Sequence, residues 1–146
     1  MPAIVKRPPP RHNETRELTH PIRIALNKLP GVRIVRNNVG TVPLPSGGRI
    51  TYGLGVGSAD LVGMVTLDAY MFVQGGDAIG DVYAMSKRTI ARPLLLELKR
   101  PGHHPSPVQS RWLRTANRLG AYAAVVHSLE EALDAVQRCR AGLSLP

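Results

Sequence analysis

Cysteine is nearly absent from this chain, since Cys139 is the only one among 146 residues. The chain can therefore form no intramolecular disulfide, and a zinc site built from several cysteines is excluded. Near the end of the last predicted helix, Cys139 is expected to pack as a small apolar residue.

Long apolar runs are absent as well. No segment is apolar over enough residues to cross a bilayer, and residues 1–11 lack the continuous apolar core of a signal peptide. We therefore expect an intracellular, cytoplasmic protein with no membrane contact. Residues 1–13 are instead basic and rich in proline, which predicts an extended arm, either free in solvent or in contact with DNA.

Acidic residues are few, with 10 Asp and Glu against 19 Lys and Arg, and the formal net charge is +9. Such a charge favours a polyanionic partner, because neutralising phosphates releases counterions and adds affinity that does not depend on base sequence. It selects a class of partner and no reaction, since ribosomal and capsid-associated proteins are also basic. The length suits one compact domain, which we place at residues 14–146.

Hydrophobic periodicity and turn residues predict an α/β fold. Apolar residues at helical spacing indicate a helix at 19–29, ended by Pro30 and Gly31. Capping residues Ser106 and Ser128 indicate helices that reach about residues 119 and 140. A loop or hairpin is expected around residues 45–48, and strands are expected at 32–35, 50–54, 61–67, 94–99 and 121–127.

Residues 68–92 have no clear pattern. They form either short strands joined by a turn at residues 75–77 or an insertion into the domain.

Two short segments indicate chemistry. Glu97 and Lys99 lie two residues apart on a predicted strand, so their side chains project from one face; the alternative is a solvated pair at the strand's end. Asp60 stands among small and apolar neighbours, where a bound metal ion would offset the cost of desolvating it. A turn or capping role is the alternative for Asp60.

Together these residues resemble the PD-(D/E)xK nuclease signature, with Ala59 in the place of the proline. The resemblance extends over about residues 14–135 to the stand-alone VRR-NUC nucleases, which are common in phages. The matching segments, in the same order and spacing, are residues 36–40, 52–60, 97–102 and 106–109.

This resemblance implies a restriction-endonuclease-like core, in which helices flank a mixed central sheet, and an Mg²⁺ or Mn²⁺ site. Asp60 and Glu97 would hold the metal together with the backbone carbonyl of Leu98. Lys99 would orient or activate the attacking water and stabilise charge in the transition state.

Two further site residues follow from the resemblance. Gln109 would face the site from the helix after the strand, although position N3 of a capping box accounts for a glutamine without catalysis. We expect that one rotamer cannot fill both roles. Glu17, with Glu14 as the alternative, would complete the metal shell from the first helix. Pro21 favours a helix only from about His20, so Glu17 is equally expected on a lead-in turn.

Several residues are candidates for contact with DNA. Arg36, Asn37 and Asn38 would hold phosphate oxygens or form an Asn-rich turn. The remaining candidates are basic, with Arg100 in a loop and a stripe at helical spacing made of Arg111, Arg114 and Arg118. A solvated helix face is the alternative for the arginine stripe. His103 and His104 are expected to contact solvent or DNA backbone, with a general-base role as the alternative for His103. Trp112 is expected in the core, with base stacking as its alternative.

The expected function is a metal-dependent DNA endonuclease that hydrolyses phosphodiester bonds and selects DNA by its structure, such as a four-way junction. The resemblance also implies a homodimer, because two symmetric cuts need two sites. The alternative is a basic DNA-binding or packaging-associated protein without catalysis.

Overall fold

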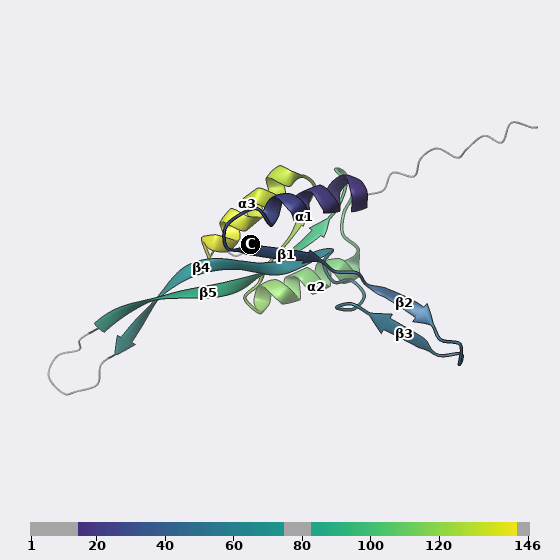
Figure 1. Ribbon diagram of the computed structural model, residues 1–146, viewed down its shortest axis with the longest axis horizontal. Coiled ribbons are helices and arrows are strands. Elements are labelled where there is room, and N and C mark those ends of the chain that lie inside the picture. Colours follow the sequence, from purple (N-terminus) through teal and green to yellow (C-terminus); the bar gives the residue numbers. More distant parts are fainter. Residues whose placement is uncertain (1–14, 75–82, 143–146) are drawn as a thin grey trace, which may run out of the picture.

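The computed structural model describes residues 15–74 and 83–142 (Figure 1). Their main sheet has four strands in the order β1-β4-β5-β6, with bounds Val32–Arg36, Leu61–Gln74, Tyr83–Leu98 and Tyr122–Val126. The first three strands of this order pair antiparallel, whereas β5 and β6 pair parallel. The predicted α/β class with a mixed central sheet is therefore confirmed.

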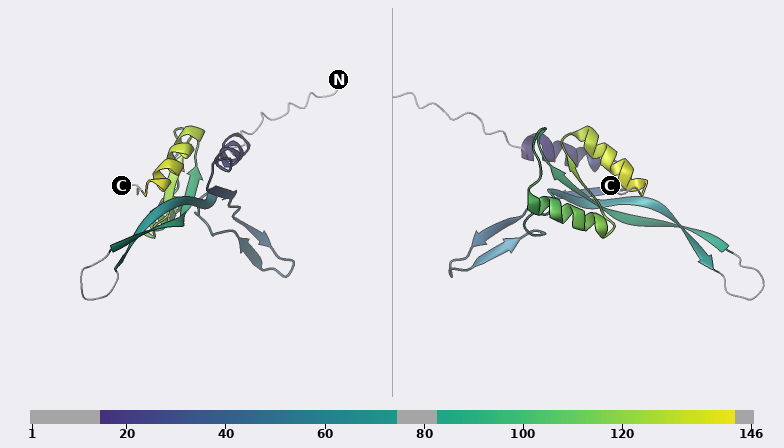
Figure 2. Two further views of the ribbon diagram at one scale, coloured as in Figure 1. Left: turned by 60° about the vertical axis from the view of Figure 1, so that its left-hand side comes forward. Right: turned by 180° about the vertical axis from the view of Figure 1, so that it is seen from behind.

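Helices flank both faces of this sheet. Helices α1 (His20–Leu26) and α3 (Leu129–Arg140) lie together on one face, and α2 (Pro107–Arg118) lies on the other (Figures 1 and 2). Of the described helices, none is long and apolar enough to cross a membrane.

Alternation along β5 assigns its side chains to the two helical layers. Leu94, Leu96 and Leu98 are buried in the core cluster that includes residues of α1 and α3, while Leu95 packs against the smaller cluster under α2. Each fully buried leucine stabilises the fold by about 2 kcal/mol by removing apolar surface from water. A shift of the β5 register by one residue would turn these leucines to the other face of the sheet and lose this free energy. Glu97 consequently points to the same face as Leu95, toward α2.

The first helix is shorter than predicted. A π-helical turn, η1 (Thr15–Thr19), precedes α1, and α1 ends at Leu26 instead of residue 29. Pro21 stands in the first turn of α1, where its missing N–H costs nothing. Glu17 accordingly lies on a lead-in turn outside the α-helix, one of the two placements expected.

Within residues 68–92, the described parts 68–74 and 83–92 belong to two long antiparallel strands, as in the predicted hairpin, and these strands are longer than the short ones expected. Strands β4 and β5 pair from Leu61 opposite Leu96 to Gln74 opposite Tyr83, and their outer parts form an arm that projects away from the helices (Figure 1). The predicted turn at residues 75–77 falls outside the described residues. On the arm, the Lys87 ammonium lies 2.7 Å from Asp68 and lowers the pKa of that carboxyl.

A separate two-stranded sheet forms the hairpin predicted around residues 45–48. It consists of β2 (Gly40–Pro43) and β3 (Arg49–Tyr52), so the returning strand begins and ends earlier than the predicted 50–54. This hairpin also projects from the body of the protein (Figures 1 and 2).

The helix starts follow the capping residues. The Ser106 hydroxyl accepts from the Gln109 N–H and the Ser128 hydroxyl accepts from the Glu131 N–H. The Glu131 carboxylate reaches past Ser128 to accept from the His127 N–H. Near the end of α3, Cys139 is fully buried as predicted, and burial raises the pKa of its thiol.

Two asparagines cover the outer strands of the sheet. The Asn27 amide donates to the Ile34 carbonyl at 2.8 Å and accepts from the Ile34 N–H at 3.1 Å. Asn117 does the same for Ala123 at the opposite edge, with distances of 2.8 and 2.9 Å. Each amide therefore satisfies edge groups that would otherwise invite another strand.

Replacing Asn117 with alanine should lower the free energy of unfolding by about 2 kcal/mol, because the N–H and carbonyl of buried Ala123 lose their partners. Urea unfolding measures this difference. Thr115→Ala, an exposed substitution on the same helix, is the control and should change stability by no more than about 0.5 kcal/mol. Equal effects of the two substitutions would contradict the role of the amide.

Candidate active site

Glu97 and Lys99 form an ion pair at the end of β5. The Lys99 ammonium lies 2.6 Å from Glu97 Oε1, and the exposed fractions of the two side chains are 19% and 0%. The prediction that both project from one face is therefore confirmed, and the solvated alternative for Glu97 is wrong. A carboxylate without solvent contact depends on nearby cations and donors for its charge.

Asp60 lies beside this pair at the start of β4. Leu61 is opposite Leu96, so continuing the register by one residue brings Asp60 opposite Glu97. The Leu98 N–H donates to Asp60 Oδ2 at 2.9 Å, and the Asn37 N–H donates to the Asp60 carbonyl at 2.8 Å. Asn37, just after β1, and Leu98 of β5 thus position Asp60, and its carboxylate is bonded to the residue next to Glu97.

Gln109 joins the site from the first turn of α2. Its Oε1 accepts from the Ser106 N–H at 2.8 Å, and its Nε2 donates to Glu97 Oε1. The expectation that one rotamer cannot fill both roles is therefore wrong. The amide has an acceptor and a donor end, and the capping geometry turns the donor end toward β5. One side chain thus caps the helix and donates a hydrogen bond to Glu97.

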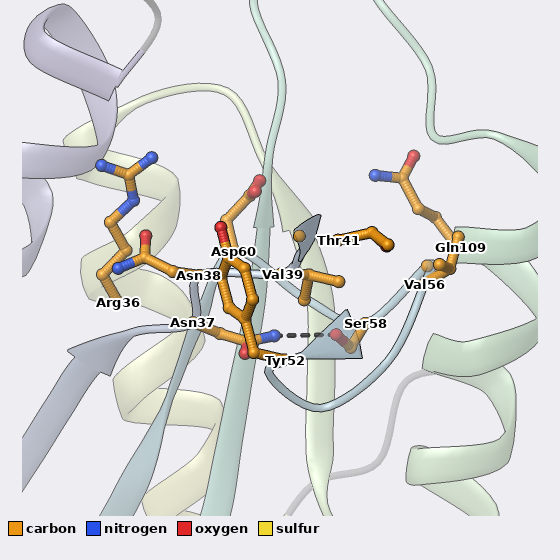
Figure 3. A pocket seen from close by; sticks show the side chains of 12 residues that line it. Arg36, Asn37, Asn38, Val39, Thr41, Tyr52, Val56, Ser58, Asp60 and Gln109 are labelled. Carbon is orange, nitrogen blue, oxygen red and sulfur yellow. Dashed lines mark hydrogen bonds between the residues drawn. The ribbon is translucent and has the colours of Figure 1, made fainter. Parts of the chain in front are cut away.

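A cavity of about 670 Å³ lies beside Asp60 (Figure 3). Its lining joins Asp60 and Gln109 to residues 36–41, which run from the end of β1 into β2, to Tyr52 at the end of β3, and to the loop 56–58 before β4. Figure 3 shows the Tyr52 side chain standing between Asn37 and Asp60. Sequence reasoning missed Tyr52 as a site residue, and its place in the matched segment 52–60 was the available signal.

Asn37 holds the loop that leads to Asp60. Its Nδ2 donates to Ser58 Oγ at 2.7 Å and to the Ala59 carbonyl at 2.9 Å, and its Oδ1 accepts from the Leu54 N–H at 3.3 Å. The expected Asn-rich turn is not formed, because residues 37–39 adopt no turn and every described residue with a positive φ is a glycine. Contact of Asn37 with phosphate stays a prediction. Arg36 and Asn38 line the cavity, where phosphate contact stays a prediction.

Glu17 borders a different cavity, of about 410 Å³, together with Leu18, Arg100, Pro101 and His103. Within residues 15–74 and 83–142, no three or more His, Cys, Asp or Glu side chains gather closely enough to hold a metal. The structure therefore does not bring Glu17 together with Asp60 and Glu97 as a third acidic ligand. Glu17 lies in the wide turn before Pro21, while Glu14 falls outside the described residues.

The predicted basic stripe is present on α2. Arg111, Arg114 and Arg118 are all exposed on the helix whose first turn contributes Gln109 to the cavity. His103 and His104 are exposed, as expected for residues that meet solvent. Trp112 is partly buried and packs against the core cluster of Ala59, Leu113 and Ala123, which agrees with its predicted place in the core.

Comparison of the chain with protein-family models, with curated proteins and with solved structures finds no significant match.

Proposed function

We propose that this protein is a metal-dependent DNA endonuclease of the PD-(D/E)xK type, similar to the stand-alone VRR-NUC nucleases. One observation supports this most strongly: residues from β4, β5 and α2 place Asp60, Glu97, Lys99 and Gln109 at one end of the sheet. The order helix, three strands of the main sheet, helix, strand and helix also fits a restriction-endonuclease-like core.

The donor set fits a hard divalent cation. Asp60 and Glu97 are carboxylates on neighbouring strand ends, and Mg²⁺ commonly binds through one or two carboxylates while it keeps several waters. Three acidic side chains are therefore not required. Asp60 and Glu97 would hold Mg²⁺ or Mn²⁺, with the Leu98 carbonyl as a further oxygen donor. The bound ion would supply a more acidic water and neutralise charge on the phosphate.

The side chains of Lys99 and Gln109 would supply the rest of the proposed chemistry. Lys99 retains about one fifth of its side-chain exposure, so its ammonium can reach both Glu97 and a phosphate at the surface. There it would orient the attacking water and stabilise the charge that develops on the phosphoryl oxygens. Gln109 would hold the Glu97 carboxylate in place by its amide hydrogen bond.

Binding of DNA is attributed to the basic surface. The net charge of +9 provides affinity for backbone phosphates, and the exposed arginines of α2 would contact phosphates from the helix whose first turn contributes Gln109. Arg36, Asn38 and Arg100 are the further candidates, together with Asn37. The proposed substrate is branched DNA, including four-way junctions, cut by a homodimer.

Purified protein should cleave plasmid or branched DNA with Mg²⁺ or Mn²⁺ and should be inactive in EDTA. Asp60→Asn keeps the size of the side chain but removes its charge, and we expect it to lower the cleavage rate by about a thousandfold or more. Gel assays across single-stranded, duplex, flap and four-way-junction DNA measure both the rate and the preferred structure.

Asp68→Asn is the matched control, because it neutralises an exposed carboxylate on the strand that follows Asp60 and should leave cleavage unchanged. Cleavage in EDTA, or by Asp60→Asn at the wild-type rate, would contradict the mechanism. Tight DNA binding without any cleavage would favour the non-catalytic DNA-binding alternative, which the complete burial of Glu97 makes worth testing.

A further inference from the structure

The β2–β3 hairpin has one apolar face. Opposite residues of an antiparallel pair point to the same side, and Val42 pairs with Ile50 while Gly40 pairs with Tyr52. Val42, Ile50 and Tyr52 are each about half exposed, with fractions of 50, 53 and 48%. The other face is polar at its centre, where the Thr41 and Thr51 hydroxyls are hydrogen-bonded to each other. We call Val42, Ile50 and Tyr52 the apolar strip.

The apolar strip begins in the candidate active site. Tyr52 lines the cavity that contains Asp60 (Figure 3). Val42 and Ile50 form the next pair on the same face of the hairpin, toward its turn. A molecule that occupies the cavity is therefore in position to lie along the strip. This continuity is the reason to take the substrate as the occupant of the strip.

Gly40 explains how the Tyr52 ring is held. A Cβ on Gly40 would lie 2.3 Å from the Tyr52 hydroxyl oxygen and 2.5 Å from the ring carbon Cζ. The ring thus packs directly on the Gly40 backbone, which only glycine permits. A supported and half-exposed ring at a cavity is a ready surface for stacking.

The low charge of the hairpin indicates that the apolar strip suits the bases of DNA better than its phosphates. Among residues 39–59 Arg49 is the only charged one, although the whole chain carries +9. The strip therefore offers little to phosphates, whereas aromatic and aliphatic side chains suit the flat faces of bases. In a continuous duplex those faces are stacked on one another, so only unpaired bases are available.

We propose that Tyr52 and the apolar strip form a base-binding subsite for unpaired nucleotides beside the scissile phosphate. This inference rests on the proposed nuclease function and adds a physical basis for its choice of substrate. The cavity volume of about 670 Å³ is ample for one nucleotide, since small-molecule sites measure about 300–1,000 Å³.

Binding measured by fluorescence anisotropy in EDTA tests the subsite without cleavage. The probes are a continuous duplex, the same duplex with a short single-stranded flap, and that flap with abasic sites. The wild type should bind the flap with bases about tenfold more tightly than the abasic flap. Tyr52→Leu should abolish this preference and leave duplex affinity unchanged, and Tyr52→Phe should retain it.

Two further variants separate stacking from folding. Gly40→Ala leaves Tyr52 in the chain but displaces its ring, and it should also remove the preference for bases. Tyr70→Leu replaces an exposed tyrosine on the β4–β5 arm and should behave as the wild type. Quenching of 2-aminopurine at the first unpaired position should disappear in Tyr52→Leu and Gly40→Ala alone.

The outcomes are distinct. A preference for bases that survives in Tyr52→Leu, or an equal loss of affinity for all three probes, overturns the subsite and leaves the nuclease proposal standing. A change only in oligomeric state, seen by light scattering, also overturns it and assigns the strip to contact with a second copy. Failure of the wild type to bind any of the three probes overturns both proposals.

Discussion

Lys99→Met is expected to lower the free energy of unfolding by about 3 kcal/mol and to abolish cleavage. The substitution keeps the length of the side chain but removes the ammonium that lies 2.6 Å from fully buried Glu97. Gln109 still donates to Glu97, yet a neutral amide does not balance the carboxylate charge. Removing one partner of a buried pair costs about 3–5 kcal/mol, because the remaining buried charge loses the compensation that this partner gave.

A double-mutant cycle separates this effect from the loss of packing. Glu97→Gln combined with Lys99→Met removes both charges, and the double variant should regain stability to within about 1 kcal/mol of the wild type, because a neutral pair is far cheaper to bury. Cleavage should stay absent, since both proposed catalytic groups are gone. Urea unfolding and the gel assay measure the two properties independently.

The Lys87–Asp68 pair is the matched control for the cycle. It belongs to the same sheet and has nearly the same length, 2.7 Å, but its side chains are 58 and 48% exposed. Solvent screens such a pair, so Lys87→Met should leave the urea midpoint unchanged. If Lys87→Met and Lys99→Met destabilise the protein equally, burial of Glu97 is not the cause.

Gly63→Ala is expected to destabilise the fold by about 3 kcal/mol, because a rigid backbone leaves the new methyl group no space. A Cβ at position 63 would lie 2.1 Å from the Arg33 carbonyl oxygen and 2.6 Å from Ile34 Cα. Both atoms belong to the backbone of β1, which is paired with β4 at this point. The methyl group can be accommodated only if β1 moves away, and Arg36 and Asn37 move with it.

Gly47→Ala isolates the cost of backbone conformation. Gly47 has a φ of +88° and nothing within 4 Å of an added Cβ, so the expected loss is about 1 kcal/mol, from left-handed geometry alone. Thermal and urea unfolding compare the two variants. If the Gly63→Ala protein is as stable as the Gly47→Ala protein, β1 can move away from β4 without lowering the free energy of unfolding further.

The features predicted correctly are those set by neighbours in the chain. The helix after Ser106 begins where a serine, a proline and a glutamine meet the needs of its first turn. The projection of Glu97 and Lys99 from one face follows from the two-residue period of a strand. Local stereochemistry decides these features, so they can be predicted from the sequence before any tertiary contact is known.

The errors arose where distant segments decide the outcome. The first helix ends early because the Asn27 amide is used by Ile34 of β1. Strand β5 extends back to Tyr83 because it pairs with β4 along its whole length. Gln109 fills two roles because Glu97 lies within reach of its amide.

By itself, the sequence determined that an acid at position 60 and an acid–lysine pair at positions 97 and 99 belong to a basic α/β protein. Strand period, helix capping and net charge are local or additive properties, and they need no three-dimensional model. Only the tertiary structure decided that the Leu98 N–H donates to Asp60, that Glu17 borders another cavity, and that Tyr52 lines the same cavity as Asp60. These relations depend on strand pairing and packing across many residues, which no local pattern encodes.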